Sequence, residues 1–357
     1  MVGYWYFAVC IAVVFSSLLG YLKTVATSRD ALHPSKRMSS LINKIRRLWR
    51  RRSSAAAAVL SIRIGEFHRS QPQLHTPSNH SGTGLEGQGL VSQVCRHATL
   101  DSNTFRNWAL ALQEPWRAHR KLWELAFIAQ ALEERGMLAP TRRGLGFAVG
   151  TEKLPALFAS RGCRITATDL PADDKRNQPW AATGQWAGTL ELLNAAGLCA
   201  DSEFRQRVEY RPVDMNKIPI DLTGYDFTWS TCSFEHCGSL NLGLRFLERQ
   251  MDCLRPGGIA VHTTEFNLSS NDDTLADSSC VIYRLRDIEA VCQRLVDHGH
   301  RVEPLDLDPG NHPLDAVVDS PPYHQWATDP PARIKHLRLN LAGYVSTSIA
   351  IIVQKAS

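Results

Sequence analysis

Gly150 and Asp169 are the two residues whose types and spacing first suggest chemistry. Gly150 follows a short apolar run and precedes a helical pattern, and a residue without a side chain lets the backbone approach a ligand closely. Asp169 ends the next run of β-type residues, 19 positions later. A carboxylate at that distance can accept hydrogen bonds from both hydroxyls of a ribose. The pair therefore predicts a binding site for a nucleoside cofactor.

Further polar side chains stand where other predicted strands end. Asp214 follows a third strand, where its carboxylate can accept from an adenine amino group, and Met215 can pack against the ring. A fourth strand is followed by Ser233. Because the carboxyl ends of parallel strands share one edge of a sheet, we expect these residues to gather there. The predicted cofactor contacts are Ala148, Gly150, Glu152, Asp169, Leu170, Asp214, Met215 and Ser233.

His236 is the first candidate for a general base, since the pKa of a histidine lies near neutrality. The alternative is that Glu235 and His236 cap the next helix or line the cofactor pocket. Glu265 is predicted as a second catalytic residue, within a polar cluster at the end of the fifth strand. His262 and Asn267 of the same cluster are predicted to bind the substrate that receives the transferred group, called the acceptor below. The alternative is that they form hydrogen bonds with the backbone of the loop.

One proline-rich segment needs a separate interpretation. The tetrapeptide Ser320-Pro321-Pro322-Tyr323 resembles the catalytic tetrapeptide of DNA amino-methyltransferases. In that family it closes the fourth strand, whereas here it falls between the sixth and the seventh. We therefore expect a proline-fixed loop that borders the acceptor pocket, with Tyr323 as a substrate-binding residue. Methylation of a nucleic-acid base is not expected.

From residue 144 onward the chain alternates short β-type runs with helical patterns, which is typical of a doubly wound parallel sheet. We therefore predict an α/β, Rossmann-like fold with a seven-stranded sheet. The last two strands lack an intervening helical pattern, so they are expected to pair as a terminal antiparallel hairpin. The predicted strands are 144–149, 164–168, 208–212, 226–230, 259–264, 301–307 and 345–354, and the predicted helices are 153–161, 185–196, 240–254 and 285–298.

The sequence before this region divides into three parts. Residues 3–22 carry no charged side chain, and about twenty such residues can cross a bilayer as a helix. Basic residues follow, which by the positive-inside rule leaves the rest of the chain at the cytoplasmic face of the membrane. The alternatives are translation from Met38, which gives a cytoplasmic protein, or a cleaved or interfacial segment.

Two further helices are predicted between Thr104 and Met137, where apolar residues recur at three- and four-residue steps around Pro115. The expected organisation is a transmembrane anchor (1–25), a basic and low-complexity linker (26–100), an N-terminal helical segment (101–140) and a catalytic domain (141–357).

Composition and cysteine spacing bear on three kinds of partner or site: nucleic acid, disulfide bonds and metal ions. Much of the net charge of +5 comes from a basic run between Lys44 and Arg52, so the broad basic surface of a nucleic-acid binder is not evident. The nine cysteines form no Cys-x-x-Cys pair, which indicates reduced thiols in a cytosolic compartment. No second ligand pair follows Cys232 and Cys237 at zinc-site spacing, so no metal is expected.

The ordered set of strand-end residues resembles the class I S-adenosylmethionine-dependent methyltransferase superfamily from residue 144 to the C-terminus. The stronger parts of the resemblance are Asp226-Phe227 in the fourth strand, Glu235-His236 at its end and Leu254-Arg-Pro-Gly-Gly before the fifth. The resemblance implies S-adenosyl-L-methionine as the cofactor. It also implies methyl transfer to a hydroxyl or similar nucleophile of a small-molecule, glycan or lipid-linked acceptor.

The turn after the first strand departs from the family pattern of three alternate glycines. The matching positions hold Gly146, Ala148, Gly150 and Glu152, as in bacterial methyltransferases with a Gly-x-Glu turn and no assigned substrate. An NAD-dependent oxidoreductase is one alternative, because a carboxylate such as Asp169 would bind ribose there too. It would require a Gly-x-Gly-x-x-Gly turn, which is missing. A non-catalytic scaffold that retains the fold is the other.

Overall fold

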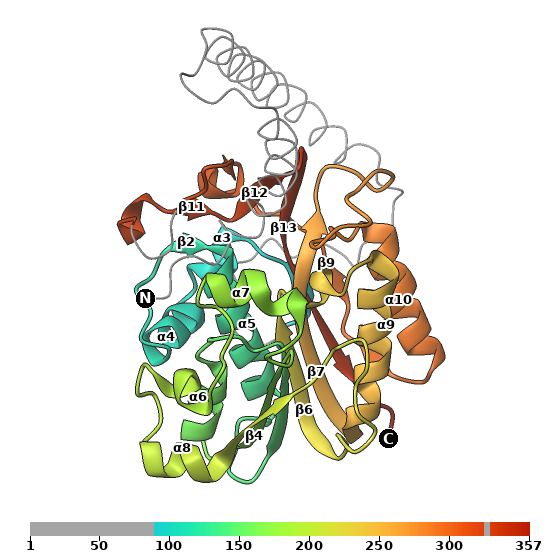
Figure 1. Cartoon of the computed structure of the whole chain (residues 1–357). Coiled ribbons are helices and arrows are strands. Elements are labelled where there is room, and N and C mark those ends of the chain that lie inside the picture. The colour runs from blue at the N-terminus through green and yellow to red at the C-terminus, as the bar shows by residue number, and fades with distance from the viewer. Residues whose placement is uncertain (1–88, 325–328) are drawn as a thin grey trace, which may run out of the picture. The chain divides into compact units, whose positions relative to one another are not determined.

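The computed structural model describes residues 89–324 and 329–357, which form a mixed sheet with helices on both faces (Figure 1). The strands are β1 (Ser92–Val94), β2 (Ala118–His119), β3 (Arg143–Phe147), β4 (Arg164–Asp169), β5 (Val208–Pro212), β6 (Tyr225–Thr231), β7 (Leu254–Asn267), β8 (Arg301–Val302), β9 (Leu305–Asp306), β10 (Val318–Asp319), β11 (Lys335–His336), β12 (Arg338–Leu341) and β13 (Tyr344–Gln354). Within the described residues, no helix combines the length and the apolar character that crossing a bilayer requires. The predicted anchor lies outside the described residues.

Eight α-helices accompany the strands in the described part of the chain. They are α3 (His97–Leu100), α4 (Asn103–Ala111), α5 (Arg120–Glu134), α6 (Leu154–Ser160), α7 (Gln178–Ala182), α8 (Asp201–Arg207), α9 (Leu240–Arg249) and α10 (Leu285–Asp297). Short 3-10 helices are η1 (Lys175–Asn177), η2 (Leu190–Asn194), η3 (Phe234–His236), η4 (Gln250–Cys253), η5 (Pro313–Asp315) and η6 (Pro331–Arg333). Helices α4, α5, α6 and α8 cover one face of the sheet, and α9 and α10 cover the other (Figure 1).

The central strands follow the order β5, β4, β3, β6, β7, β13. The first five are parallel to one another, and β13 pairs antiparallel with β7 from Ser346 to Gln354. The strand order reverses between β3 and β6, because the chain winds outward first to one side and then to the other. Such a reversal opens a crevice at the carboxyl ends of the two strands, which is where open α/β sheets bind ligands.

Six of the seven predicted strands are confirmed, and the prediction for residues 301–307 is wrong. Pro304 cannot donate to a strand ladder, and the segment breaks there into β8 and β9. The terminal hairpin therefore joins β12 to β13. The outer edge of β13 is shared by three short strands, since β8, β1 and β12 each pair with a different part of it.

The predicted helix over 185–196 is replaced by turns and the short helix η2. The side chain of Asn194 forms two hydrogen bonds with the backbone of Cys199, donating to its carbonyl at 2.8 Å and accepting from its N–H at 3.1 Å. Local bonds of this kind compete with helical ones. Gly184, whose φ is +69°, precedes the segment and also favours a turn.

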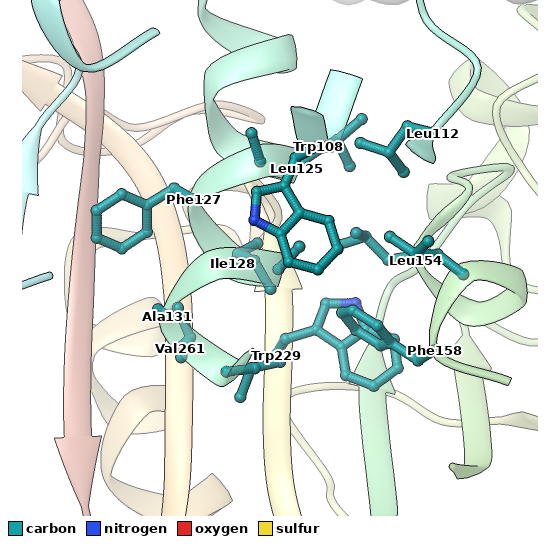
Figure 2. Close-up of a cluster of buried hydrophobic side chains, with 14 of the residues drawn as sticks. Trp108, Leu112, Leu125, Phe127, Ile128, Ala131, Leu154, Phe158, Trp229 and Val261 are labelled. Carbon is teal, nitrogen blue, oxygen red and sulfur yellow. The ribbon is translucent and has the colours of Figure 1, made fainter. Parts of the chain in front are cut away.

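The N-terminal helices belong to the same core as the sheet. Figure 2 shows Leu125 and Ile128 of α5 beside the Trp108 ring of α4, with Ile128 toward Trp229 of β6. Trp123 and Phe127 of α5 are also fully buried. Residues 92–100, within the range assigned from sequence to a linker, form β1 and α3 of this fold. The helix α5 thus starts directly above the carboxyl edge of the sheet, beside β6 and β7 (Figure 1).

Candidate active site

Asp169 and Gly150 meet at the carboxyl edge of the sheet, as their spacing predicts. The Oδ2 atom of Asp169 accepts a hydrogen bond from the backbone N–H of Gly150 at 3.0 Å, and Oδ1 accepts from Leu170 at 2.8 Å. Burial raises the pKa of Asp169 to about 6, although both backbone donors oppose the rise. A carboxylate has about four acceptor positions, so two remain for hydroxyl groups of a ligand.

The turn that carries Gly150 is held in an unusual backbone conformation. Gly150 has a φ of +53°, and Ala148 has a φ of +48°, which is uncommon for a residue with a side chain. Gly146 has another role, because a Cβ there would lie 2.4 Å from the Trp229 ring. The hydroxyl of Ser233, just beyond β6, lies 3.5 Å from the carbonyl oxygen of Ala148. The ends of β3 and β6 therefore meet at the point where the strand order reverses.

Glu152 closes this turn with its side chain turned inward. Its Oε1 atom accepts a hydrogen bond from the Trp229 indole at 2.7 Å, and the residue is 6% exposed. Burial raises the pKa of Glu152 to about 7, and the positive charge of Lys121 opposes the rise. Its carboxyl group therefore belongs to the polar interior beneath the crevice.

Glu152→Gln is expected to stabilise the folded protein in a pH-dependent way. In the unfolded chain Glu152 ionises near pH 4.5, whereas in the folded protein it keeps its proton until about pH 7. Wild-type stability therefore falls as the pH rises from 4.5 to 7, and the variant should gain about 3 kcal/mol relative to wild type across that window. Urea unfolding at pH 4.5, 6 and 7.5 measures the gain, with Glu289→Gln on the exposed face of α10 as control. A difference that does not vary with pH would contradict this assignment.

The segment after β4 lies against the other predicted cofactor residues. Asp214 accepts from the Arg176 guanidinium at 2.9 Å, and Met215 beside it is half-buried. The Trp180 ring stands edge-on to the His236 ring, with centroids 4.6 Å apart. The segment that carries Arg176 and Trp180 therefore contacts the ends of both β5 and β6.

His236 is oriented to accept a proton at one nitrogen. Its Nδ1 atom lies 2.6 Å from the carbonyl oxygen of Ser279. Because a carbonyl only accepts, Nδ1 carries the hydrogen and Nε2 keeps the lone pair. Burial lowers the pKa of His236 to about 4, so the ring is neutral at pH 7. The Nε2 atom lies 3.9 Å from Oε1 of Glu235.

A group of buried charged residues, the inner polar cluster, lies beneath these strand ends. Its members are Arg120, Lys121, Glu124, Glu152, Glu235 and Glu265, all at most 7% exposed. Glu265 pairs with the Arg120 guanidinium and also accepts from Ser346. Lys121 lies 3.3 Å from Glu124 and donates to the Thr231 carbonyl at 3.1 Å.

The three members of this cluster on α5 are not among the residues predicted from sequence. Arg120, Lys121 and Glu124 occupy the first turns of a helix that is otherwise almost wholly apolar where it is buried. Charged residues are rarely fully buried unless they are paired. Three of them at the start of a core helix are therefore the signal that could have pointed to a polar interior there.

Three predicted substrate residues are engaged elsewhere in the fold. His262 is 1% exposed, with Nδ1 2.8 Å from the Ser230 hydroxyl and its ring edge-on to Phe246 of α9. Asn267 orders the loop that follows it, accepting from the N–H groups of Ser269 and Ser270. The structure does not bring His262 or Asn267 into contact with Asp169.

Tyr323 also lies apart from the cofactor residues. Its hydroxyl donates to the Asn340 carbonyl oxygen at 2.8 Å, and its ring stands edge-on to His336. The loop that carries it therefore packs on β11 and β12. Across the described residues, no group of three or more histidine, cysteine or acidic side chains is arranged to hold a metal ion.

Comparisons with known proteins find similarity in structure only. No protein-family model matches the sequence, and no curated protein matches it. An S-adenosylmethionine-dependent methyltransferase from Mesorhizobium loti is 14% identical over 64% of this chain and 97% of its own, with a TM-score of 0.38. Phosphoethanolamine N-methyltransferase 2 of Haemonchus contortus, bound to S-adenosylmethionine, is 15% identical over 63% of this chain and 51% of its own, with a TM-score of 0.37.

A [4+2]-cyclase is similar too, at 13% identity over 64% of this chain and 82% of its own, with a TM-score of 0.38. Likeness at this level concerns the fold and leaves the reaction open. The strand order of the chain itself, with five parallel strands followed by an antiparallel one, is that of a doubly wound, mixed α/β sheet.

Proposed function

We propose that this protein binds S-adenosyl-L-methionine at the carboxyl edge of its sheet and catalyses methyl transfer. The observation that carries the proposal is the hydrogen bond between Asp169 and Gly150 at the point where strand order reverses. It sets a carboxylate with two remaining acceptor positions beside Gly150, the residue of the turn that has no side chain. The residues fit the nucleoside part of the cofactor, whose ribose offers two hydroxyl donors.

When bound, the cofactor would supply a methyl group on a sulfonium, with a neutral thioether as the leaving group when the methyl group is transferred. The chain then has to orient the acceptor, exclude water and remove a proton. His236 is the candidate for the last task, because its Nε2 atom carries the lone pair at pH 7, although a pKa lowered to about 4 makes the ring a weaker base than an exposed histidine. The carboxylate of Glu265 is bound by Arg120 and Ser346, so Glu265 would not contact the acceptor and would act only by positioning Arg120.

The proposed acceptor is a small molecule, a glycan or a lipid-linked molecule that presents a hydroxyl or similar nucleophile. We place the reaction in the cytoplasm or, if residues 3–22 anchor the chain, at the cytoplasmic membrane face. A nucleic-acid acceptor is disfavoured, because the net charge of +5 is concentrated in the basic run near the N-terminus.

Calorimetry with the full chain tests the cofactor. We expect saturable binding of S-adenosylmethionine and of S-adenosylhomocysteine, and no heat with NAD. Binding of NAD alone would support the oxidoreductase alternative, in which Asp169 holds the ribose of a dinucleotide. If neither S-adenosylmethionine nor NAD binds, the protein is a scaffold that keeps the fold without the cofactor.

A further inference from the structure

The inner polar cluster carries more negative than positive charge. Its four carboxyl groups belong to Glu124, Glu152, Glu235 and Glu265, and its two cations to Arg120 and Lys121. Two of the carboxyl groups have a cation beside them, since Arg120 pairs with Glu265 and Lys121 lies 3.3 Å from Glu124. Within the part of the chain that the structure describes, no lysine or arginine forms an ion pair with Glu152 or Glu235. Because a buried charge is costly unless it is paired, both groups either stay protonated or receive a positive charge from a ligand.

Glu235 combines two features that no other carboxylate of the cluster combines, an oxygen without a hydrogen-bond partner and the lack of a lysine or arginine beside it among the described residues; Oε2 of Glu124 also lacks a hydrogen-bond partner but lies 3.3 Å from Lys121. Glu235 is fully buried, and its Oε2 atom accepts from the Thr264 hydroxyl at 3.0 Å, but its Oε1 atom has no hydrogen-bond partner among the described residues. The nearest cationic candidate is Nε2 of His236, 3.9 Å away, on a ring that is neutral at pH 7. An acceptor oxygen left open in the interior is rare in folded proteins and calls for a partner.

The surroundings of Glu235 also disfavour its ionised form. Burial raises the pKa of Glu235, and the neighbouring charges of Glu265 and Glu124 raise it further. A ligand cation at Oε1 would reverse this effect by favouring the ionised form. The cofactor carries a sulfonium, an α-ammonium and an α-carboxylate, so its net charge of +1 would compensate only one of the two carboxyl groups. The other would still need a cation, and the open oxygen and the neighbouring His236 favour Glu235 for that place.

We propose that Glu235 binds an ammonium group of the methyl acceptor, so that the acceptor is a molecule carrying an amine. This inference rests on the proposed function, because it concerns the second substrate of the same site. An ammonium nitrogen has up to three donors, which matches an open carboxylate oxygen better than a hydroxyl does. The half-buried His236 ring lies next to Glu235, and the half-buried Trp180 ring packs on His236, so aromatic surface is near, which also favours a cation over an anion.

The test compares three small probes that differ in charge. Full-length protein saturated with S-adenosylhomocysteine is titrated with ethanolamine, ethylene glycol and glycolate at pH 7.5, and binding is followed by calorimetry. Ethanolamine should bind saturably and at least about tenfold more tightly than the neutral and anionic probes, which reflects a charge-assisted hydrogen bond. Equal or tighter binding of ethylene glycol or glycolate, or no saturable binding of ethanolamine, overturns the inference.

Two variants locate the effect. Glu235→Gln keeps the shape and removes the charge, so ethanolamine binding should weaken about tenfold. Glu303→Gln is the matched control, because Glu303 is a largely buried carboxylate that pairs with Arg135 and Arg301 away from the cluster. An unchanged ethanolamine affinity in Glu235→Gln refutes the assignment. If that variant does not fold, the three-probe comparison on the wild type decides alone.

The same experiment separates this inference from the proposed function. Binding of S-adenosylhomocysteine is measured first and depends on Asp169 and Gly150. If it fails, the cofactor proposal fails. If it succeeds and ethanolamine shows no preference, only the role of Glu235 is lost.

Discussion

Asp169→Ala is expected to weaken S-adenosylmethionine binding by about 100-fold or more. The carboxylate has two acceptor positions left after its bonds to Gly150 and Leu170, and the proposed ribose fills both. Hydrogen bonds to a charged group contribute roughly 1.5–3 kcal/mol each, and two of them account for this loss of affinity. Isothermal titration calorimetry of the two proteins at pH 7.5 measures the ratio of the dissociation constants.

Two companion variants make this result specific. Asp169→Asn keeps one oxygen for the Gly150 N–H and should fall between wild type and alanine in affinity. Asp226→Ala removes another buried carboxylate, one that pairs with Arg142 and Arg255 at the opposite end of the sheet. It should lower stability and leave the cofactor affinity unchanged. Equal affinity in wild type and Asp169→Ala would remove the basis of the proposed function.

Glu265→Ala is expected to destabilise the folded protein by about 3–5 kcal/mol, because it leaves the Arg120 guanidinium buried without its carboxylate partner. Both side chains are completely buried, so water cannot replace the lost partner. Urea unfolding at pH 7 gives the change in the free energy of unfolding. A loss below about 1 kcal/mol would mean that Arg120 is held by other groups.

The double variant Arg120→Met with Glu265→Leu provides the control. It removes both charges and fills the space with apolar side chains, and such replacements of a buried ion pair are often neutral or stabilising. The double variant should therefore recover most of the stability lost in Glu265→Ala. If it is as unstable as the single variant, the loss arises from packing or from the Ser346 hydrogen bond instead.

The parallel strands and the cofactor edge could be predicted because their signals are local. Alternating β-type runs and helical patterns mark β3 to β7, and residues at the ends of neighbouring parallel strands must meet. The meeting of Gly150 and Asp169 follows from that rule alone. Pro304 is itself a local signal for the break between β8 and β9, whereas the pairing of β1 with β13 joins segments far apart in the chain, which a single sequence does not specify.

The inner polar cluster could not be predicted because its members come from four separate segments. They are brought together from the start of α5, the turn after β3, η3 and β7. The polar residues at the end of β7 also divide between two faces, since side chains three positions apart on a strand point in opposite directions. Glu265 therefore faces Arg120 of α5, whereas His262 faces Phe246 of α9. Their closeness in sequence predicts one polar cluster for Glu265 and His262, but the two side chains lie on opposite faces of the sheet.

The division of the β13 edge among three short strands bears on how the molecule avoids self-association. An open strand edge is a template on which another chain can add, and long edges are the main route to aggregation in β proteins. Here β1 closes the middle of that edge, between β8 and β12. Residues 92–94 thus cover part of the edge of β13, an apolar strand. Proteolysis on their C-terminal side would expose backbone N–H and C=O groups of β13, with which another chain could pair.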